Sequence, residues 1–477
     1  MNSLPLIIDL DGTLIHTDML HESAIRTFRD KPAEVLRIPF LLARGKAVLK
    51  RRLAQHGEFD AASLPYNMAL LDWLHQQRSD GRKLILCTAS DQSIANAIAE
   101  HLGVFDEVMA SDGVVNLAGK NKAAALVERF GQAGYDYAGN SQADLPVWRS
   151  ARRAVVVNAP ADLAKRAADC CEVERSFAAP GAGFTAWRRV LRVHQWLKNL
   201  LLFVPLFAAH EFPNPAHWLP LVLAFVAFSL CASSVYIAND LLDLESDRQH
   251  PRKRHRPFAS GQVPAWQGVL CAPLLLLASA GVAWQVGGAF FSWLAGYFLV
   301  TCAYSWFLKR LMLVDCLALA MLYTLRIVAG AAALAMPLSF WLLAFSVFLF
   351  LSLAFVKRYA ELQVQILNGK KKAHGRGYLT TDAPLIQMLG ISSGYAALVV
   401  LALYLNSETV LMLYRSPEFV WGAVPVMLFW VSWMWMQAHR GNMHDDPLVY
   451  AVKDKASLFA GACFAMVLAA GSAEWPW

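Results

Sequence analysis

Three aspartates lie at helical spacing directly behind a long apolar run. Residues 239–261 read NDLLDLESDRQHPRKRHRPFASG. On a continuous helix Asp240, Asp243 and Asp247 share one face, where carboxylate oxygens can hold Mg²⁺. Cations that can bind phosphate oxygens follow at Arg248, Arg252, Lys253, Arg254 and Arg256. The segment predicts a magnesium and polyphosphate site at a membrane surface. The alternative is a solvated basic loop, which accounts for the cations but not for three aligned carboxylates.

A second pair of carboxylates ends an apolar strand near the N-terminus. Residues 6–10 read LIIDL and run into Asp9-Leu10-Asp11-Gly12-Thr13. A buried strand that ends in this way carries its carboxylates to the edge of a parallel sheet, where sites of α/β proteins form. The D-x-D-G-T pattern resembles the first motif of the haloacid dehalogenase superfamily of phosphatases. That resemblance implies that Asp9 is the nucleophile and Asp11 the general acid and base.

The remaining motifs of that superfamily follow in order along the chain. Thr88 follows the apolar strand 83–87, and Lys122 opens a helix in GKNKAAAL, with Lys120 as a near competitor. The resemblance implies that Thr88 and Lys122 bind phosphate. In GNSQAD, Asn140 stands where an aspartate is usual and Asp144 closes the motif. The implied Mg²⁺ ligands are Asp9, Asp11, Asn140 and Asp144.

The asparagine at position 140 leaves the activity of this part open. An amide oxygen can coordinate Mg²⁺ but carries one negative charge fewer than a carboxylate. We therefore expect weaker metal binding or a slower reaction, and loss of activity remains an alternative. Residues 32–59 read as a helical insert at the position where this superfamily has its cap.

These motifs divide between two parts of different composition. The chain has 477 residues, 57% of them hydrophobic, and a mean hydropathy of +0.37. Short apolar runs alternate with charged stretches up to about residue 176, and long apolar segments dominate from about residue 196. We predict an α/β domain over 1–177, with a Rossmann-type parallel sheet and a small helical cap. A linker over 178–186 then leads to an all-α polytopic membrane domain over 187–477.

The membrane part predicts nine transmembrane helices. Their ranges are about 197–209, 218–238, 266–286, 289–307, 313–335, 337–356, 384–406, 419–438 and 456–473. Under strict alternation, the outer loops carry only Arg415, whereas the inner ones hold the remaining basic residues that flank the spans, including Lys370–Lys372. Basic loops stay in the cytoplasm. We therefore expect a multi-pass protein of the cytoplasmic membrane, with its N-terminal domain inside and its C-terminus outside.

The acidic segment NDLLDLESD resembles the first aspartate-rich motif of the UbiA superfamily, nine-helix transferases that bind prenyl diphosphates through Mg²⁺. The resemblance implies that Asn239, Asp240, Asp243 and Asp247 hold a metal-bound diphosphate. The second acidic motif of that superfamily is expected at the end of the sixth span. There the chain reads KRYAEL, with Lys357, Arg358 and Glu361. Cations in place of acids predict a substrate with an additional phosphate. An ordinary surface ion pair between Lys357 and Glu361 is the alternative.

Together the two blocks resemble the polyprenyl-phosphate phosphoribosyltransferases of that superfamily. The implied donor is 5-phosphoribosyl diphosphate and the implied acceptor a polyprenyl phosphate, with Lys253 and Arg256 among the phosphate ligands. Arg326 lies within an apolar span, so we expect it to meet a phosphate or a carboxylate such as Asp315. Further positions that resemble the superfamily are Tyr304, Lys309, Asp445, Asp446 and Lys453, and Trp196, Lys198 and Asn199 open the first span.

The order of the two parts predicts two successive reactions. A transferase of this kind makes a lipid-linked ribose that still carries a 5-phosphate, and a phosphatase domain can remove it. Two other functions remain open. An aromatic prenyltransferase that uses a prenyl diphosphate would have a more acidic second motif. A transporter or lipid-binding protein with a regulatory soluble domain would need polar residues across both leaflets. We expect no nucleic-acid partner, because the basic residues cluster beside membrane spans.

Overall fold

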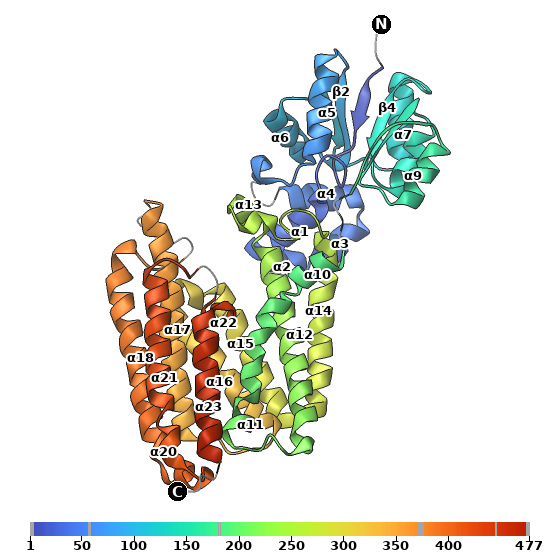
Figure 1. Cartoon of the computed structure of the whole chain (residues 1–477). Coiled ribbons are helices and arrows are strands. Elements are labelled where there is room, and N and C mark those ends of the chain that lie inside the picture. The colour runs from blue at the N-terminus through green and yellow to red at the C-terminus, as the bar shows by residue number, and fades with distance from the viewer. Residues whose placement is uncertain are drawn as a thin grey trace. The chain divides into compact units, whose positions relative to one another are not determined.

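The computed structural model describes residues 4–55, 59–179, 181, 183–369, 376–443 and 446–473. It divides into two compact units, which Figure 1 shows as parts of one chain. Unit 1 comprises Met1–Leu191 and Tyr236–Ala272, and unit 2 comprises Arg192–Val235 and Pro273–Trp477. Two long helices, α12 (Trp218–Leu242) and α14 (Ala265–Val286), contribute residues to both units.

Unit 1 is built on a six-stranded parallel sheet in the order β3-β2-β1-β4-β5-β6. The strands are β1 (Leu6–Ile8), β2 (Leu84–Asp91), β3 (Glu107–Ser111), β4 (Asp136–Gly139), β5 (Arg153–Val157) and β6 (Glu172–Phe177). Strand β1 pairs with β2 on one side and with β4 on the other, so Ile7 lies between Ile85 and Tyr137. The direction of winding reverses at β1, and this is where α/β sheets form their sites. The predicted α/β fold is confirmed.

Alternation along β1 gives the sheet a core on each face. Leu6 and Ile8 pack into one apolar cluster and Ile7 into the other, because successive side chains of a strand point to opposite faces. Helices cover both faces. They are α5 (Met68–Ser79), α6 (Gln92–Leu102), α7 (Lys120–Phe130), α8 (Leu145–Trp148) and α9 (Ala161–Ala168), with the short 3₁₀ turns η1 (Ala61–Ser63) and η2 (Gln142–Asp144).

The helical insert predicted over residues 32–59 is present as three helices, and a helix that precedes it, α1, completes a cap of four helices. They are α1 (Met19–Asp30), α2 (Pro32–Val35), α3 (Ile38–Ala43) and α4 (Lys46–Ala54). The side chain of Asp18 caps the start of α1 by accepting hydrogen bonds from two backbone N–H groups. The left-handed Gly45, with φ of 117°, separates α3 from α4. The cap therefore begins only seven residues after Asp11 and stays close to the end of β1.

The acidic segment belongs to the same unit as the sheet. Helix α13 (Leu244–Gln249) and the turn η5 (Lys253–His255) follow α12, and α10 (Phe184–Val190) lies in the same unit. Arg248 of α13 donates two hydrogen bonds to Glu22 of α1, at 2.6 and 3.2 Å, and only 6% of each side chain is exposed. A buried, bidentate ion pair thus joins the acidic segment to the cap.

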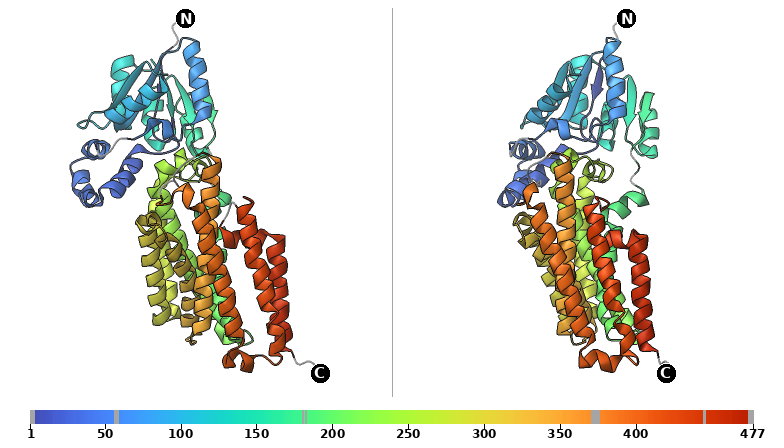
Figure 2. Two further views of the ribbon diagram at one scale, coloured as in Figure 1. Left: turned by 90° about the vertical axis from the view of Figure 1, so that its left-hand side faces the viewer. Right: turned by 60° about the vertical axis from the view of Figure 1, so that its left-hand side comes forward.

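Unit 2 is all-helical, and its long helices run beside one another in both views of Figure 2. It contains the first part of α12 and the last part of α14. Its other long helices are α15 (Gly288–Trp306), α16 (Val314–Ala333), α17 (Phe340–Leu367), α18 (Ala383–Leu405), α21 (Ala423–His439) and α23 (Lys455–Ser472). The shorter elements are η3 (Val193–Phe203), α11 (Val204–Ala208), η4 (Pro215–His217), η6 (Leu308–Arg310), η7 (Thr380–Asp382), α19 (Glu408–Leu413), α20 (Pro417–Val420) and α22 (Pro447–Lys453).

Seven helices of the described ranges are long and apolar enough to cross a membrane. The two other predicted spans correspond to α15 and to the 3₁₀ segment η3 followed by α11, so the number nine stays a prediction. Helix α11 carries Pro205 in its first turn, which is where a helix accepts proline. The Lys370–Lys372 run lies outside the described residues.

Close helix packing in unit 2 depends on Gly330. It lies on α16 with its backbone against the carbonyl of Leu202 in η3, and a Cβ atom there would overlap that oxygen. Substitution by alanine must therefore push the first helical segment away from α16.

We expect Gly330→Ala to destabilise the protein by about 1–3 kcal/mol, because the overlap cannot be relieved by a side-chain rotation. Thermal unfolding in detergent measures the change. Gly461→Ala is the matched control, because Gly461 lies in the middle of α23 with nothing close to the position of its missing Cβ. It should be neutral or slightly stabilising. Equal effects of the two substitutions would contradict this account of the packing.

Candidate active sites

The carboxylates of the first motif lie at the carboxyl end of β1, as predicted. Asp9 is buried, and its Oδ1 lies 2.6 Å from Nζ of Lys122, at the start of α7. Asp11 accepts a hydrogen bond from the backbone N–H of Met19, at 2.8 Å, which ties it to the first turn of α1. Lys122 also donates to the hydroxyl of Tyr137, at 2.9 Å. Lys120, the competing lysine, is exposed, so Lys122 is the one that reaches this site.

The second motif contributes two hydroxyl groups, of which only Thr88 was predicted. Thr88 donates to Oδ2 of Asp11 at 3.5 Å, and Ser90 donates to the same atom at 2.7 Å. Ser90 was missed because the predicted strand ended at residue 87, and a lone serine beyond it has no distinctive pattern. Its position two residues after Thr88, on the same face of β2, is the signal that could have found it.

Burial and neighbouring charges shift the pKa values of this site. Burial raises the pKa of Asp9 to about 7, although Lys122 opposes the shift. Burial and the charge of Asp18 raise the pKa of Asp11 to about 6. Burial disfavours the charged form of Lys122, but Asp9 outweighs it and holds the lysine pKa above its ordinary value. A carboxylate beside a charged lysine and a second carboxyl group that titrates near neutrality suit nucleophilic and acid–base catalysis.

The acidic motif after β4 is arranged around hydrogen bonds. Oδ2 of Asp144 accepts from the backbone N–H groups of Asn140 and Ser141, at 3.0 and 2.9 Å, and from the Ser141 hydroxyl. Its Oδ1 accepts from Tyr137, at 2.7 Å. Asp144 therefore orients the loop that presents Asn140. Two observations require a glycine at position 12. The Asn140 amide occupies the space that a Cβ atom would need, and the φ angle of 75° is one that other residues rarely adopt.

The candidate metal ligands of this site offer oxygen donors, as Mg²⁺ requires. Asp9, Asp11, Asn140 and Asp144 all line one cavity of about 540 Å³. Within the described ranges, however, no group of three or more His, Cys, Asp or Glu side chains is gathered closely enough to hold a metal ion. A cation here would therefore depend on the Asn140 amide or on oxygens of the substrate to complete its coordination. The metal role of these residues stays a prediction.

Two elements outside the sheet complete the walls of this cavity. The cap contributes Lys46 and Lys50, and the start of α14 contributes Trp266. Lys50 donates to the carbonyl of Ala89, at 2.7 Å, beside the second motif. Cations and an aromatic ring around the carboxylates favour an anionic substrate.

The acidic segment holds two of its three carboxylates together through an arginine. Arg256 Nη1 lies 3.0 Å from Asp240 Oδ1 and 2.6 Å from Asp247 Oδ2, and both carboxylates are buried. Asp243 lies at the junction of α12 and α13, where the helix is interrupted. The three aspartates are therefore not on one continuous helix, although the backbone N–H of Asp247 still bonds to the carbonyl of Asp243.

One carboxylate oxygen in this segment is suited to a cation. Asp247 Oδ1 is buried and accepts no hydrogen bond, and Lys253 Nζ approaches it only to 3.7 Å. An unsatisfied buried anionic oxygen is costly unless a cation neutralises it. Asp240 and Asp247 thus fit a Mg²⁺ ion. In this structure Arg256 neutralises the negative charge of the two carboxylates instead. Asn239 lies in the last turn of α12, next to Asp240.

The KRYAEL motif divides between two charge clusters of unit 2. Lys357 Nζ lies 3.2 Å from Asp446, which also accepts from Lys198 at 2.8 Å and from Tyr323. Two lysines thus share one aspartate. Asp446 was named only as a loop position in the sequence, and its neighbour Asp445 lies outside the described residues.

Arg358 belongs to the other cluster and has no exposed surface. It pairs with Asp315, at 2.5 Å, and with Glu361, while Arg376 lies 3.4 Å from each of these carboxylates. Tyr378 donates to Asp315, at 2.5 Å, and Tyr304 accepts from Arg376. The alternative of a Lys357–Glu361 ion pair is therefore wrong for this structure, because Arg358 and Arg376 take up Glu361.

Arg326 is buried as predicted, but Asp315 is not its partner. The two residues lie eleven positions apart on α16, roughly 16 Å along the axis. Arg326 instead donates to Asn199 Oδ1, at 3.0 Å, and to the hydroxyl of Tyr297, at 2.9 Å. Neutral acceptors leave its positive charge uncompensated by these bonds. Lys309 lies in η6, just after α15.

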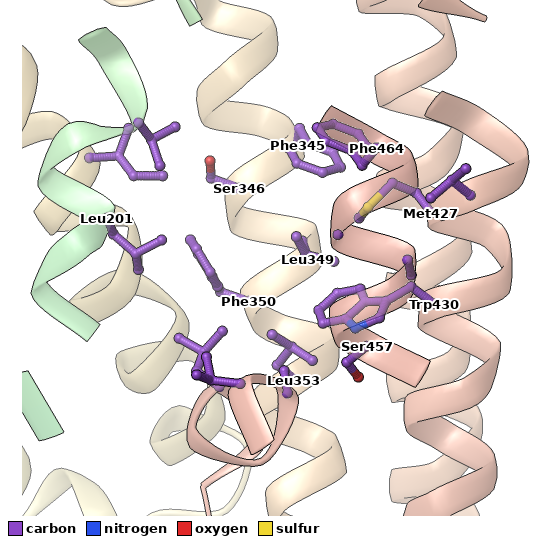
Figure 3. Close-up of a pocket in the computed structure, with 18 of the residues that line it drawn as sticks. Leu201, Phe345, Ser346, Leu349, Phe350, Leu353, Met427, Trp430, Ser457 and Phe464 are labelled. Atoms are coloured by element: carbon purple, nitrogen blue, oxygen red, sulfur yellow. The ribbon is translucent and has the colours of Figure 1, made fainter. Parts of the chain in front are cut away.

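A mainly apolar cavity of about 520 Å³ lies within unit 2. Figure 3 shows Leu201 on one side of it and Met427 and Trp430 on the other, with Phe350 between them. The remaining lining comes from α11, α16, α17, α21, α22 and α23. Such a cavity fits a hydrocarbon chain.

The chain belongs to the UbiA prenyltransferase family, whose model matches residues 200–459. Residues 6–149 match the model of the haloacid dehalogenase-like hydrolases. The protein is thus a polytopic membrane transferase of the UbiA family fused to a haloacid dehalogenase-like domain, as the motifs predicted.

Three relatives show how far this similarity extends. An uncharacterized protein, y4nM, of Sinorhizobium fredii is 39% identical over 464 residues, which cover 97% of this chain and 90% of the relative. The nodulation protein NoeC of Azorhizobium caulinodans is 40% identical over 278 residues, 58% of this chain and 89% of the relative. A decaprenyl-phosphate phosphoribosyltransferase of Mycolicibacterium smegmatis is 31% identical over 275 residues, 56% of this chain and 86% of the relative.

We expect Arg256→Gln to make the stability of the protein depend on Mg²⁺. Without a divalent cation, Asp240 and Asp247 lose their shared counter-charge, which should cost about 3 kcal/mol. Added Mg²⁺ should restore the loss, because a cation that binds the folded state stabilises it. The measurement is the unfolding temperature in detergent, with EDTA and then over a Mg²⁺ titration.

The control is Arg252→Gln, which removes an exposed cation from the same loop. It should respond to Mg²⁺ as the unaltered protein does. If Arg256→Gln responded no more strongly than this control, Asp240 and Asp247 would not be competent to hold the metal.

Proposed function

We propose that this protein transfers 5-phosphoribose from 5-phosphoribosyl diphosphate to a polyprenyl phosphate and then removes the 5-phosphate. The observation that carries the proposal is the pair of lysines on one aspartate. Lys198 and Lys357 both contact Asp446, so among the described residues two cations share one carboxylate in a largely buried place. A buried excess charge is costly without an anion, and a phosphate group supplies one.

The acidic segment supports the diphosphate end of the donor. Asp240, Asp243 and Asp247 would hold Mg²⁺, which neutralises the negative charge that develops on a departing diphosphate. Arg256 would then be released from the carboxylates and become able to bind phosphate oxygens. Asn239 and Lys253 lie beside these residues and would complete the binding of the donor.

The apolar cavity of unit 2 supports a lipid acceptor. It is lined almost entirely by aliphatic and aromatic side chains and would hold part of a prenyl chain. The lipid phosphate would attack the anomeric carbon of the ribose, forming a C–O bond as the bond to the diphosphate breaks. The cations Arg326, Lys357 and Arg358, with Tyr304 and Lys309, would orient the phosphates of the two substrates. The relative from Mycolicibacterium smegmatis, 31% identical over 56% of this chain, is a decaprenyl-phosphate phosphoribosyltransferase, which supports the same donor and acceptor here.

The sheet domain would perform the second step. Asp9 would attack the 5-phosphate while Asp11 protonates the departing ribose oxygen, and Asp11 would next activate water to release the phosphate from Asp9. Lys122 and Thr88 would hold the phosphate oxygens. We further propose that this domain and the basic loops lie in the cytoplasm and the C-terminus outside, since those loops carry the Lys and Arg residues.

The transfer reaction can be tested directly. Purified protein is incubated with Mg²⁺, labelled 5-phosphoribosyl diphosphate and a polyprenyl phosphate, and the lipid is analysed for label and for the 5-phosphate. We expect labelled lipid that has lost the 5-phosphate. Inhibition by a prenyl diphosphate, with no transfer of the sugar label, would instead indicate an aromatic prenyltransferase.

We expect Asp9→Asn to stop the second step and leave the first intact. The amide cannot form an aspartyl-phosphate, so lipid that keeps its 5-phosphate should accumulate. Chromatography of the labelled lipid measures this. An unchanged product would mean that the sheet domain does not act on this lipid.

The reciprocal control is Asp243→Ala in the acidic segment. It should reduce transfer by at least about a hundredfold, because the metal-bound diphosphate is no longer neutralised. Phosphatase activity on a supplied phosphate monoester should persist. Loss of both activities would point to general misfolding.

The phosphatase step should depend on pH through Asp9. Its pKa is raised to about 7, and Lys122 restrains that rise. Removing the lysine charge by Lys122→Met should raise the pKa further, so the nucleophile becomes ionised only at higher pH. The acid limb of the rate profile should then move to higher pH, as well as fall in amplitude. Lys120→Met, an exposed neighbour, should leave the profile in place.

A further inference from the structure

The cap carries four large apolar side chains that stay exposed. We call them together the cap face, and they are Phe28, Leu36, Phe40 and Leu42. Leu36 is 76% exposed and Phe40 is 75% exposed. An exposed patch of large apolar side chains marks an interaction site when it is surrounded by polar residues.

The local sequence explains why these side chains remain uncovered. Pro32 and Pro39 each open a short helix, so α2 and α3 turn too early to lay one continuous face on the sheet domain. Residues 35–43 read VLRIPFLLA and are apolar on nearly all sides, so one packing surface cannot cover them.

The cap face is surrounded by positive charge. Residues 31–54 contain a single acid, Glu34, and seven basic residues, Lys31, Arg37, Arg44, Lys46, Lys50, Arg51 and Arg52. Lys31, Arg37, Arg44 and Arg52 are exposed. Aromatic and aliphatic side chains beside several cations form the pattern that binds anionic lipid surfaces.

The cap is also attached to the end of a membrane span. The span that includes α12 ends at Leu242, and α13 begins two residues later. Helix α13 holds the cap through the buried Arg248–Glu22 ion pair, and Gln249 donates to Asp60, beyond the cap, at 3.4 Å. Only the break at Asp243 therefore separates the end of this predicted span from the helix that holds the cap. Figure 1 labels α12, α13 and the cap helices α1 to α4.

The cavity of the sheet domain opens between the same elements. Leu42 of the cap face lines it, and so does Trp266, in the first turn of the membrane helix α14. Tryptophan at the end of a membrane span is typical of the interface with lipid headgroups. One residue of the cap face and one residue of a membrane helix thus line the same cavity.

We propose that the cap face docks onto the anionic headgroup surface of the membrane that holds this chain. Phe40 and Leu36 insert among the headgroups, and the surrounding cations bind lipid phosphates. Docking keeps the cavity of Asp9 at the lipid surface, so that it takes phosphate monoesters carried by membrane lipids. This last consequence rests on the proposed phosphatase function, whereas docking itself does not.

A photo-crosslinking residue placed at position 40 tests docking without any activity. The full-length protein carries p-benzoylphenylalanine in place of Phe40, is reconstituted in nanodiscs with and without anionic lipid, and is irradiated. We expect about tenfold more lipid adduct than from position 114, and more with anionic lipid than without. Val114 is the matched control, because it is 85% exposed on the same unit but does not belong to the cap face. A crosslink to a second copy of the chain instead of lipid, or equal adducts at both positions, would overturn the proposal.

The consequence for substrate choice has its own test. Leu36→Ser with Phe40→Ser should reduce hydrolysis of the lipid-borne phosphate monoester about tenfold, because the cavity is no longer held at the lipid surface. Hydrolysis of a water-soluble monoester, p-nitrophenyl phosphate, should change less than about twofold. Val114→Ser with Val115→Ser is the control for loss of exposed apolar side chains.

The two tests separate the two ways of failing. Lipid adducts at position 40 without hydrolysis of either monoester would leave docking in place and overturn the phosphatase function. The opposite result is that the protein forms no lipid adducts and hydrolyses both monoesters, with equal rates before and after the Leu36→Ser and Phe40→Ser substitutions. That result would overturn docking and leave the phosphatase function in place.

Discussion

A charge removed from water requires an opposite charge close by, and both parts of this chain are arranged around that requirement. In the sheet domain Lys122 meets Asp9. In the acidic segment Arg256 meets Asp240 and Asp247, and in the membrane part Arg358 meets Asp315. The proposed chemistry would use all of these side chains except Asp315. The protein therefore holds its binding groups as internal ion pairs that a phosphorylated substrate and its metal would exchange for external ones.

Exchange of partners gives binding a conformational component. Arg256 cannot neutralise the two aspartates and bind a phosphate at the same time, so arrival of Mg²⁺ would free it. The two lysines on Asp446 differ from this case, because in the described part of the chain they share a single carboxylate. An anion would be favoured there without any rearrangement. Under the proposed function, the acidic segment would bind its ligand by exchanging Arg256 for Mg²⁺, whereas the lysine cluster would bind an anion without such an exchange.

The ion pair between Arg248 and Glu22 gives the fusion of the two parts a physical meaning. It joins the helix that carries Asp247 to the helix that follows Asp11, and both side chains are nearly inaccessible to water. Thr17 also donates to Glu22, at 2.6 Å, which ties the loop after Asp11 into the same network. The acidic segment of the transferase is therefore part of the compact unit that contains the haloacid dehalogenase-like domain. The boundary between the two families does not coincide with the boundary between the two units.

Local sequence alone determined the elements and the positions of most motif residues. The apolar runs and their length identified the parallel strands and the membrane helices. A buried strand needs a short run of apolar residues, whereas a helix that crosses a membrane needs a much longer one. The position of Asp9, Thr88, Lys122 and Asn140 at one sheet edge followed from the rule that parallel strands end together.

Tertiary structure alone decided which charges are paired. Arg326 and Asp315 carry opposite charges, but they lie eleven positions apart on one helix and cannot meet. Glu361 pairs with Arg358 and Arg376 rather than Lys357, and Asp446 becomes the partner of two lysines from distant segments. Coulomb attraction acts on distance in space, and the sequence specifies that distance only within a single helix or strand. The three aspartates that the sequence places at helical spacing show the same limit, since the break at Asp243 leaves Arg256 to bring Asp240 and Asp247 together.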